Sequence, residues 1–121
     1  MGLGSFLNNT CETSELHSQR ELRSRYYKIN YAKAKARVLE YAKEIKADAR
    51  HIDDAHKELF LQSNRFHIIV SFVQITPIET SIDFKVEVYG LAGFNRPRKK
   101  IVEMYAYLDK HLDFKGVGLH P

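Results

Sequence analysis

The chain contains two neighbouring segments in which every second residue is apolar. Between residues 65 and 75 one such set is Phe66, Ile68, Val70 and Phe72, and the positions between them are Arg65, His67, Ile69, Ser71 and Val73. Side chains two positions apart point to the same face of a β-strand, so this segment is predicted to be a strand with one apolar face. Residues 80–90 repeat the pattern after the turn sequence "TPIE", with apolar positions Ile82, Phe84, Val86 and Val88. One apolar and one polar face is typical of an antiparallel sheet that is covered on one side.

Two other segments show the longer period of an amphipathic helix. Residues 31–47 follow Asn30, which is a favourable N-cap. The second segment follows the loop sequence "GLAGFN" and ends before the C-terminal residues 114–121. In both, the apolar residues fall three or four positions apart and form one stripe for packing on a sheet. The stripes consist of Tyr31, Ala34, Val38, Tyr41, Ala42 and Ile45, and of Ile101, Met104, Tyr105, Leu108 and Leu112.

The remaining segments are shorter or irregular. Residues 21–30 alternate well enough to predict a strand, and residues 49–63 predict two short strands joined by a turn near Asp53. Residues 1–20 have no sustained period and are rich in Asn, Ser, Thr and Gly, so we expect a flexible N-terminal arm. Residues 21–121 are then expected to form a single α+β domain with the element order β-α-β-β-β-β-α.

This order predicts a curved antiparallel sheet with two helices on its apolar face. It resembles the half-domain of the TATA-binding-protein-like fold and the related helix-grip folds, over residues 21–113 and by element order alone. The resemblance implies that a small apolar ligand could be carried between the sheet and the long helix. A filled core is the simpler interpretation for so short a chain. The residues that would line a ligand site are Phe66, Phe72, Phe84, Tyr105 and Leu108.

Composition narrows the class of protein. The 121 residues include 44% apolar and 28% charged residues, which is enough for one domain with a core that needs no disulfide or metal. Cys11 is the only cysteine, and this suits a reducing cytosol. No apolar run approaches the roughly 18 residues of a membrane span. We therefore expect a cytoplasmic protein of bacterial type, without a membrane span or a cofactor.

Two clusters contain residue types that are used in metal binding or catalysis. The stretch "HIDDAH" holds His51, Asp53, Asp54 and His56, but a turn with solvated Asp is a commoner explanation of it than a metal site. Ser71, His67 and Asp83 are expected on the polar face of the sheet. A flat sheet face offers no oxyanion hole and does not exclude water. We therefore predict no metal site and no catalytic residues, and we favour a non-enzymatic protein over an enzyme.

The stretch "GFNRPRKK" places cations at the start of the last helix, where the helix dipole is positive. This raises the hypothesis of an anion or nucleic-acid site formed by Arg96, Arg98, Lys99 and Lys100. On a helical wheel drawn from Ile101, however, Arg98 falls at the margin of the apolar stripe while the other cations spread over the solvent side. A net charge of +4 also favours anionic partners only weakly, so nucleic-acid binding is not the favoured function.

The polar face of the sheet is not wholly polar. Its expected apolar members are Phe60, Ile69, Val73 and Tyr89. Apolar residues on an otherwise polar face indicate that something covers it: the N-terminal arm, a second copy of the chain or a ligand. We favour the second copy. The predicted function is thus a non-enzymatic interaction or assembly module that forms a homodimer, and no motif in the sequence specifies a reaction.

Overall fold

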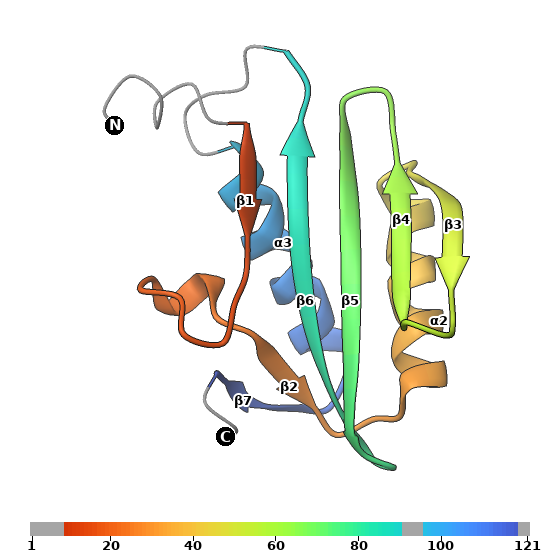
Figure 1. The fold of residues 1–121 in the computed structure, drawn as a ribbon, viewed down its shortest axis with the longest axis vertical. Coiled ribbons are helices and arrows are strands. Elements are labelled where there is room, and N and C mark those ends of the chain that lie inside the picture. Colours follow the sequence, from red (N-terminus) through yellow and green to blue (C-terminus); the bar gives the residue numbers. More distant parts are fainter. Residues whose placement is uncertain (1–8, 91–95, 119–121) are drawn as a thin grey trace.

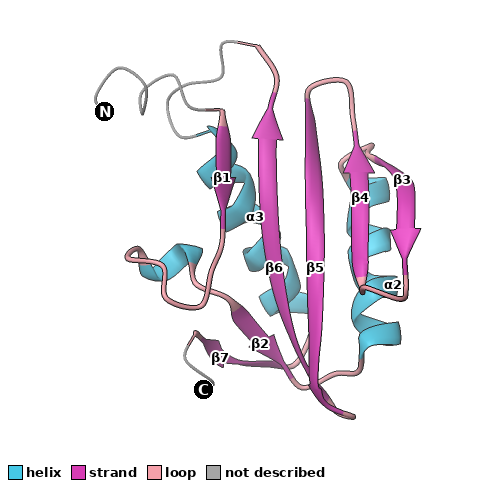
Figure 2. Ribbon diagram, in the orientation of Figure 1, coloured by secondary structure: helices cyan, strands magenta, loops and turns pink. Residues whose placement is uncertain are grey.

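The computed structural model describes residues 9–90 and 96–118 of the chain. Within these ranges, seven strands form one antiparallel sheet with the order β3-β4-β5-β6-β2-β7, and β1 pairs with β6 (Figure 1; Figure 2). The strands are β1 (Thr10–Glu12), β2 (Arg25–Tyr27), β3 (Asp48–Asp53), β4 (Glu58–Gln62), β5 (Phe66–Thr76), β6 (Glu79–Val88) and β7 (Phe114–Val117). The helices are the 3₁₀ turn η1 (Arg20–Leu22), α2 (Tyr31–Glu44) and α3 (Arg96–His111).

The α+β class, the antiparallel sheet and the two helices are confirmed. The structure adds β1 and β7, which are three and four residues long and therefore too short to show a period. β1 lies within the segment expected as an arm, and its Cys11 is paired with Val86 of β6. Residues 1–8 of that segment lie outside the described residues. The sheet thus gains one strand near each end of the chain that the predicted element order did not contain.

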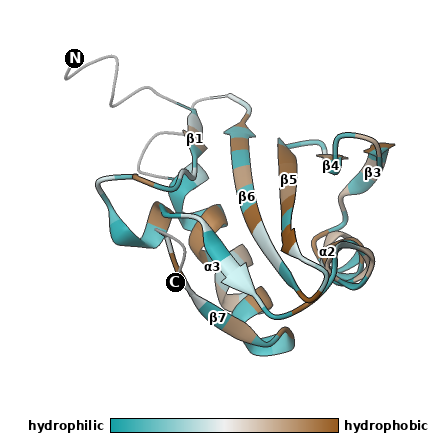
Figure 3. Cartoon of the chain, turned by 60° about the horizontal axis from the view of Figure 1, so that its bottom comes forward, coloured by the Kyte–Doolittle hydropathy of each residue, from teal (hydrophilic) through white to brown (hydrophobic). Residues whose placement is uncertain are grey.

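Both helices pack on the same face of the sheet (Figure 3). The predicted alternation is confirmed on that face, since Ile68, Val70 and Phe72 of β5 are buried and face the helices. Tyr105 of α3 reaches between the layers and donates a hydrogen bond to the carbonyl of Ile82 at 2.7 Å. The other buried core side chains of β6 and α3 are Phe84, Val86, Ile101, Met104 and Leu108.

Local hydrogen bonds set the ends of α2. The side chain of Asn30 accepts a hydrogen bond from the backbone N–H of Lys33 at 2.9 Å, which confirms the predicted N-cap. The helix ends three residues earlier than the pattern predicted, because Lys46 adopts a left-handed conformation with φ of 58°. Ala47 N–H then bonds to Ala42 O, and Lys46 N–H to Lys43 O, as in a Schellman motif. This turn directs the chain into β3.

The hairpin formed by β5 and β6 is the longest feature of the sheet. Its pairing runs from Phe66 opposite Val88 to Thr76 opposite Glu79. The neighbouring strands are shorter, so the closed end of the hairpin extends beyond them (Figure 1). No described helix is both long and apolar enough to cross a membrane.

Candidate functional site

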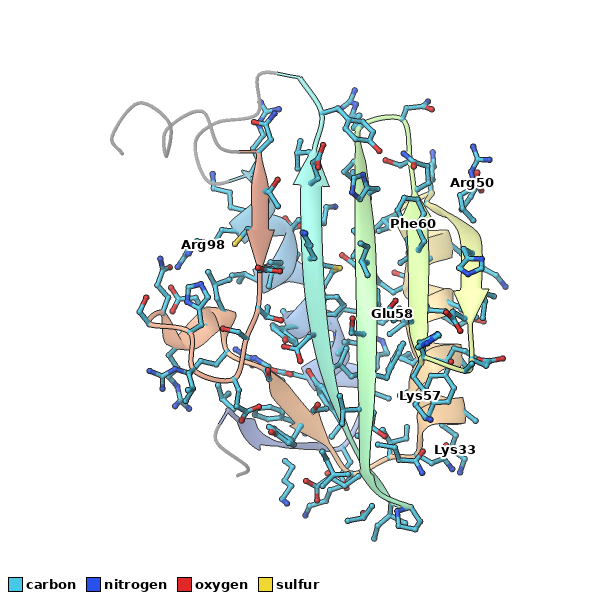
Figure 4. The ribbon with its side chains drawn as sticks, viewed as in Figure 1. Lys33, Arg50, Lys57, Glu58, Phe60 and Arg98 are labelled. Atoms are coloured by element: carbon cyan, nitrogen blue, oxygen red, sulfur yellow. The ribbon has the colours of Figure 1, made fainter. Side chains whose placement is uncertain are left out.

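The face of the sheet opposite the helices is the candidate site. In the described part of the chain, no helix or strand lies over the outer face of β3, β4, β5 and β6 (Figure 4). Cross-strand partners point to the same face, so the register fixes which side chains meet there. One row across these strands consists of His51, Phe60, Ile69 and Lys85.

Four side chains form a contiguous group on this face, which we call the sheet-face cluster: Phe60, His67, Ile69 and Tyr89. The rings of Phe60 and His67 are stacked with their centroids 5.2 Å apart, and the rings of His67 and Tyr89 are 5.7 Å apart. Ile69 is the cross-strand partner of Phe60. The structure therefore brings together three of the four residues predicted for the dimer face and adds His67 to them.

Hydrogen bonds hold the ring of Tyr89 in place. Its hydroxyl lies 2.9 Å from Nδ1 of His67 and accepts a hydrogen bond from Nε2 of Gln62 at 2.6 Å. These contacts connect β4, β5 and the end of β6. The cluster is thus ordered by the chain itself, and a partner that binds it would have few side chains to immobilise.

The cluster remains partly open to solvent. Tyr89 is 39% exposed, whereas Phe60 and Ile69 are half-buried by their neighbours. A shallow hollow of about 140 Å³ lies beside Phe60 and is lined by His51, Glu58, Leu59, Phe60 and Ile69. Val73, the fourth residue predicted for the dimer face, is 53% exposed and lies further along β5, opposite Ser81.

Charged side chains of both signs border the sheet-face cluster. Lys85 is exposed beside Ile69, and Glu58 is exposed on β4 (Figure 4). Glu87 lies next to the cluster, with a carboxylate oxygen 4.0 Å from Nε2 of His67. The face as a whole is thus neither acidic nor basic. Such a surface does not select a strongly charged partner.

The serine, histidine and aspartate considered as a catalytic group occupy this face but have different partners. Ser71 lies opposite Asp83 in the sheet. The carboxylate of Asp83 accepts hydrogen bonds from Thr13 and Ser24, each at 2.6 Å. His67 is engaged by the aromatic rings and Tyr89 instead.

The cations at residues 96–100 are dispersed. Arg98 forms an ion pair with Glu21, and its Nε donates to Gln19 at 2.9 Å. A backbone hydrogen bond first and the contact with Arg98 second lower the pKa of Glu21. Lys100 places its ammonium over the ring of Phe66, 4.6 Å from the centroid. Arg96 and Lys99 are exposed, so the structure does not bring the four cations together on one ligand.

The residues predicted to line an apolar ligand are packed into the core. Phe72, Phe84, Tyr105 and Leu108 are all buried, and the rings of Phe84 and Tyr105 contact edge to face at 4.9 Å. Phe66 is half-buried below Lys100. Core side chains thus surround these residues on the helix side of the sheet.

The "HIDDAH" stretch forms the end of β3 and the turn after it. Asp53 accepts hydrogen bonds from the backbone of His56 at 3.1 Å and from its ring at 2.8 Å, and these lower the pKa of Asp53. Asp54 turns toward α2, where Tyr31 and Lys35 donate to it. The two carboxylates therefore have separate partners. In residues 9–90 and 96–118, no group of three or more metal-ligating side chains is present.

Two features of the surface were not predicted from the sequence. The first is Gln62, which completes the sheet-face cluster through Tyr89. The second is the apolar end of the β5–β6 hairpin, at Ile75, Pro77 and Ile78. The signal for the second was visible in the stretch "ITPIE", where isoleucines flank a turn that is usually polar.

Comparison of the chain with family models, with curated proteins and with solved structures found no match. The assignment of a function therefore rests on the surface itself.

Proposed function

We propose that the protein is a cytoplasmic interaction module that forms a homodimer through the uncovered face of its sheet. We also propose that its fold is of the TATA-binding-protein-like, helix-grip-related type, with one sheet face packed by helices and the other free for contacts. The observation that carries the proposal is the sheet-face cluster, in which aromatic and aliphatic side chains are ordered on a face that no described element covers.

The chemistry of the cluster favours a protein partner. Aromatic side chains contribute much of the energy of protein interfaces, because they bury a large area and have few rotatable bonds. Phe60, Ile69 and Tyr89 supply such a centre, while Lys85 and Glu58 supply a polar rim. Hydrogen bonds with His67 and Gln62 fix Tyr89 before binding, which lowers the entropic cost of association.

The mixed charge of the rim favours a second copy of the same chain. In a symmetric dimer each surface meets itself, so a rim of one sign would repel its copy. Here Lys85 and Glu58 lie on either side of Ile69, on β6 and β4. A stable dimer of standard size buries roughly 800 Å² per partner, about a tenth of the 7257 Å² accessible surface of this chain.

Sedimentation equilibrium over a range of protein concentrations tests this proposal. We expect a reversible dimer, and we expect Ile69→Asp to weaken it by about 100-fold or more, because the new carboxylate would be desolvated at the centre of the interface. Phe60→Ala is a milder variant that retains the strand, with an expected loss of about tenfold. Leu16→Asp is the matched control, since Leu16 is 77% exposed and lies outside the sheet.

Two results would contradict the proposal. One is a wild-type protein that remains a monomer at the highest concentration reached. The other is a dimer whose affinity is the same in wild type, Ile69→Asp and Phe60→Ala, with circular dichroism showing that the variants are folded.

A further inference from the structure

The closed end of the β5–β6 hairpin exposes aliphatic side chains. Ile78 is 74% exposed and Ile75 is 42% exposed, on either side of the exposed Pro77. We call these three residues the hairpin tip. A hydrogen bond from the backbone N–H of Ile78 to Oγ1 of Thr76, at 3.2 Å, orders the turn. Neither isoleucine belongs to the buried core, so the fold itself does not require an apolar residue at either position.

The hairpin tip lies far from the sheet-face cluster. On β5, Ile69 is the member of the cluster nearest to the tip, and Ile75 of the tip is six residues further along the strand. At about 3.4 Å per residue, these two residues are about 20 Å apart. An occupant of the sheet-face cluster therefore leaves the hairpin tip exposed, and the tip needs an explanation of its own.

Two lysines lie near the base of the hairpin tip, on the side of β2 and β7. Lys28 directly follows Tyr27, whose partner in the sheet is Thr80 of the hairpin. Lys115 donates to Glu79 at 2.8 Å, at the point where β6 begins. On this side of the molecule the hairpin is therefore flanked by two amines, of which one neutralises the acidic residue of the hairpin.

The first turn of α2 adds cations on the other side. The backbone N–H of Tyr31 donates to the side chain of Gln74 at 2.9 Å, which places the start of α2 against the hairpin. Lys33 lies in that turn. Lys57 is held beside the same strand through its carbonyl, which accepts a hydrogen bond from Phe72 at 2.9 Å, and its ammonium lies over the ring of Tyr31, 5.6 Å from the centroid. Figure 4 shows Lys33 and Lys57 toward the end of the molecule where the hairpin closes.

Two of these amines have no carboxylate partner. In the part of the chain that the structure describes, no carboxylate forms an ion pair with Lys28 or Lys33. Lys115 pairs with Glu79, while Lys35 pairs with Asp54 and the charge of Lys57 also acts on Asp54. We call Lys28 and Lys33 the lysine collar. The collar adds positive charge on two sides of a small apolar projection.

This combination matches the surface of a membrane that contains anionic lipid. Such a surface presents negative headgroups above an apolar layer, so amines bind at the headgroups while a short aliphatic projection enters below them. A protein partner is less suitable, since three residues on a narrow turn supply only a small part of a standard interface. We infer that the hairpin tip and the lysine collar dock the protein peripherally on an anionic phospholipid surface.

Cosedimentation with vesicles tests this inference. We expect wild-type protein to bind vesicles of phosphatidylcholine mixed with phosphatidylserine much more than vesicles of phosphatidylcholine alone, and to dissociate as NaCl is raised. Ile78→Asp should reduce the partition coefficient about tenfold or more, because it removes an aliphatic group that the membrane would bury and adds a negative charge. Lys28→Glu combined with Lys33→Glu should reduce both the binding and its dependence on salt.

Leu16→Asp is again the control, because Leu16 and Ile78 are 77% and 74% exposed and the same charge is introduced at both. Its partition coefficient should equal that of the wild type. The inference is overturned if wild-type protein binds neither kind of vesicle, or if Ile78→Asp binds as well as Leu16→Asp. It is also overturned if Ile78→Asp abolishes the dimer seen without vesicles, since the tip would then be a protein contact. Ile69→Asp, which tests the sheet-face dimer, separates failure of one proposal from failure of the other.

Discussion

The carboxylate of Asp83 accepts a hydrogen bond from the hydroxyl of Ser24 at 2.6 Å. The same oxygen accepts a second hydrogen bond from Thr13, also at 2.6 Å. These two donors lie where the chain leaves β1 and where it enters β2, the two short strands that share the edge of β6. Asp83 thus joins both to the sheet at the point where backbone pairing with β6 is interrupted.

Removal of this carboxylate should destabilise the protein. Asp83→Ala leaves the buried hydroxyls of Thr13 and Ser24 without their acceptor, and we expect the free energy of unfolding to fall by about 2–3 kcal/mol. Ser24→Ala removes one donor and should cost about 1 kcal/mol. Urea denaturation at one fixed protein concentration measures both. Glu12→Ala, on the exposed side of β1, is the control and should change stability by less than about 0.5 kcal/mol. Equal effects of Asp83→Ala and Glu12→Ala would disprove this role.

A second prediction concerns the ion pair between Arg25 of β2 and Asp109 of α3. The guanidinium lies over the rings of Tyr105 and Phe114, and Asp109 also accepts a hydrogen bond from the hydroxyl of Tyr27 at 2.7 Å. Burial first, and then this hydrogen bond, raise the pKa of Tyr27 well above its ordinary value. The pair therefore links the second strand to the last helix inside a largely apolar environment.

Asp109→Ala leaves a largely buried cation without its partner, so we expect a loss of about 3 kcal/mol in the free energy of unfolding. Tyr27→Phe removes one hydrogen bond but preserves the ion pair, and it should cost only about 1 kcal/mol. Thermal and urea unfolding of the two variants give the comparison. If Tyr27→Phe proves as damaging as Asp109→Ala, the ion pair is not what stabilises this contact.

The left-handed residue after α2 allows a stabilising substitution. Lys46 has φ of 58°, a conformation that glycine adopts without strain. Because the Schellman motif requires this conformation, Lys46→Gly should raise the free energy of unfolding by about 0.5–1 kcal/mol. Lys43→Gly is the matched control within the last turn of the helix, and it should lower stability by about 1 kcal/mol. A lower free energy of unfolding for Lys46→Gly would show that the side chain of Lys46 itself stabilises the fold.

Alkaline pH should reveal the burial of Tyr41. Burial first, and then the carboxylates of Glu103 and Glu44, raise the pKa of Tyr41 to about 12. In the unfolded chain the phenol ionises near pH 10, so between about pH 10 and 12 the unfolded state loses a proton that the folded state keeps. The stabilisation that Tyr41 contributes below pH 10 is therefore lost as the pH rises through this window.

Chemical denaturation at a series of pH values measures this effect. Tyr41→Phe should reduce by about one the number of protons released on unfolding near pH 11. Between pH 8 and 9 the stability of both proteins should depend on pH equally, which serves as the internal control. A wild-type protein and a variant with the same slope at pH 11 would show that Tyr41 ionises alike in both states.

The long periodic segments were predictable because their periods repeat many times. The alternation through Ile68 and Val70, and the helical stripe through Ile101 and Leu108, each indicated an element and the face that it buries. Asn30 was predictable as an N-cap because its cause is local. Strands β1 and β7 were not predictable in this way. Their few residues are held by pairing with β6 and β2, segments that are distant along the chain.

The candidate site could also be predicted only in part, because some of its contacts join distant segments of the chain. The sequence placed Phe60, Ile69 and Tyr89 on one face of a sheet, since alternation determines the face. It could not show that Tyr89 meets His67 and Gln62, because these contacts depend on the register between three strands. It also could not show that Arg98 pairs with Glu21, since these two residues are 77 positions apart.

The sequence by itself determined the α+β class, the apolar faces of the long strands and helices, and the start of α2, because periodicity and capping act over a few neighbouring residues. The tertiary structure decided the strand order, the sheet-face cluster, the partners of Arg98 and Asp83, and the exposure of Ile78. These features arise where segments that are remote in sequence pair along the edges of the sheet or pack on its faces. Which of them meet depends on the packing of the whole domain, and no single segment encodes it.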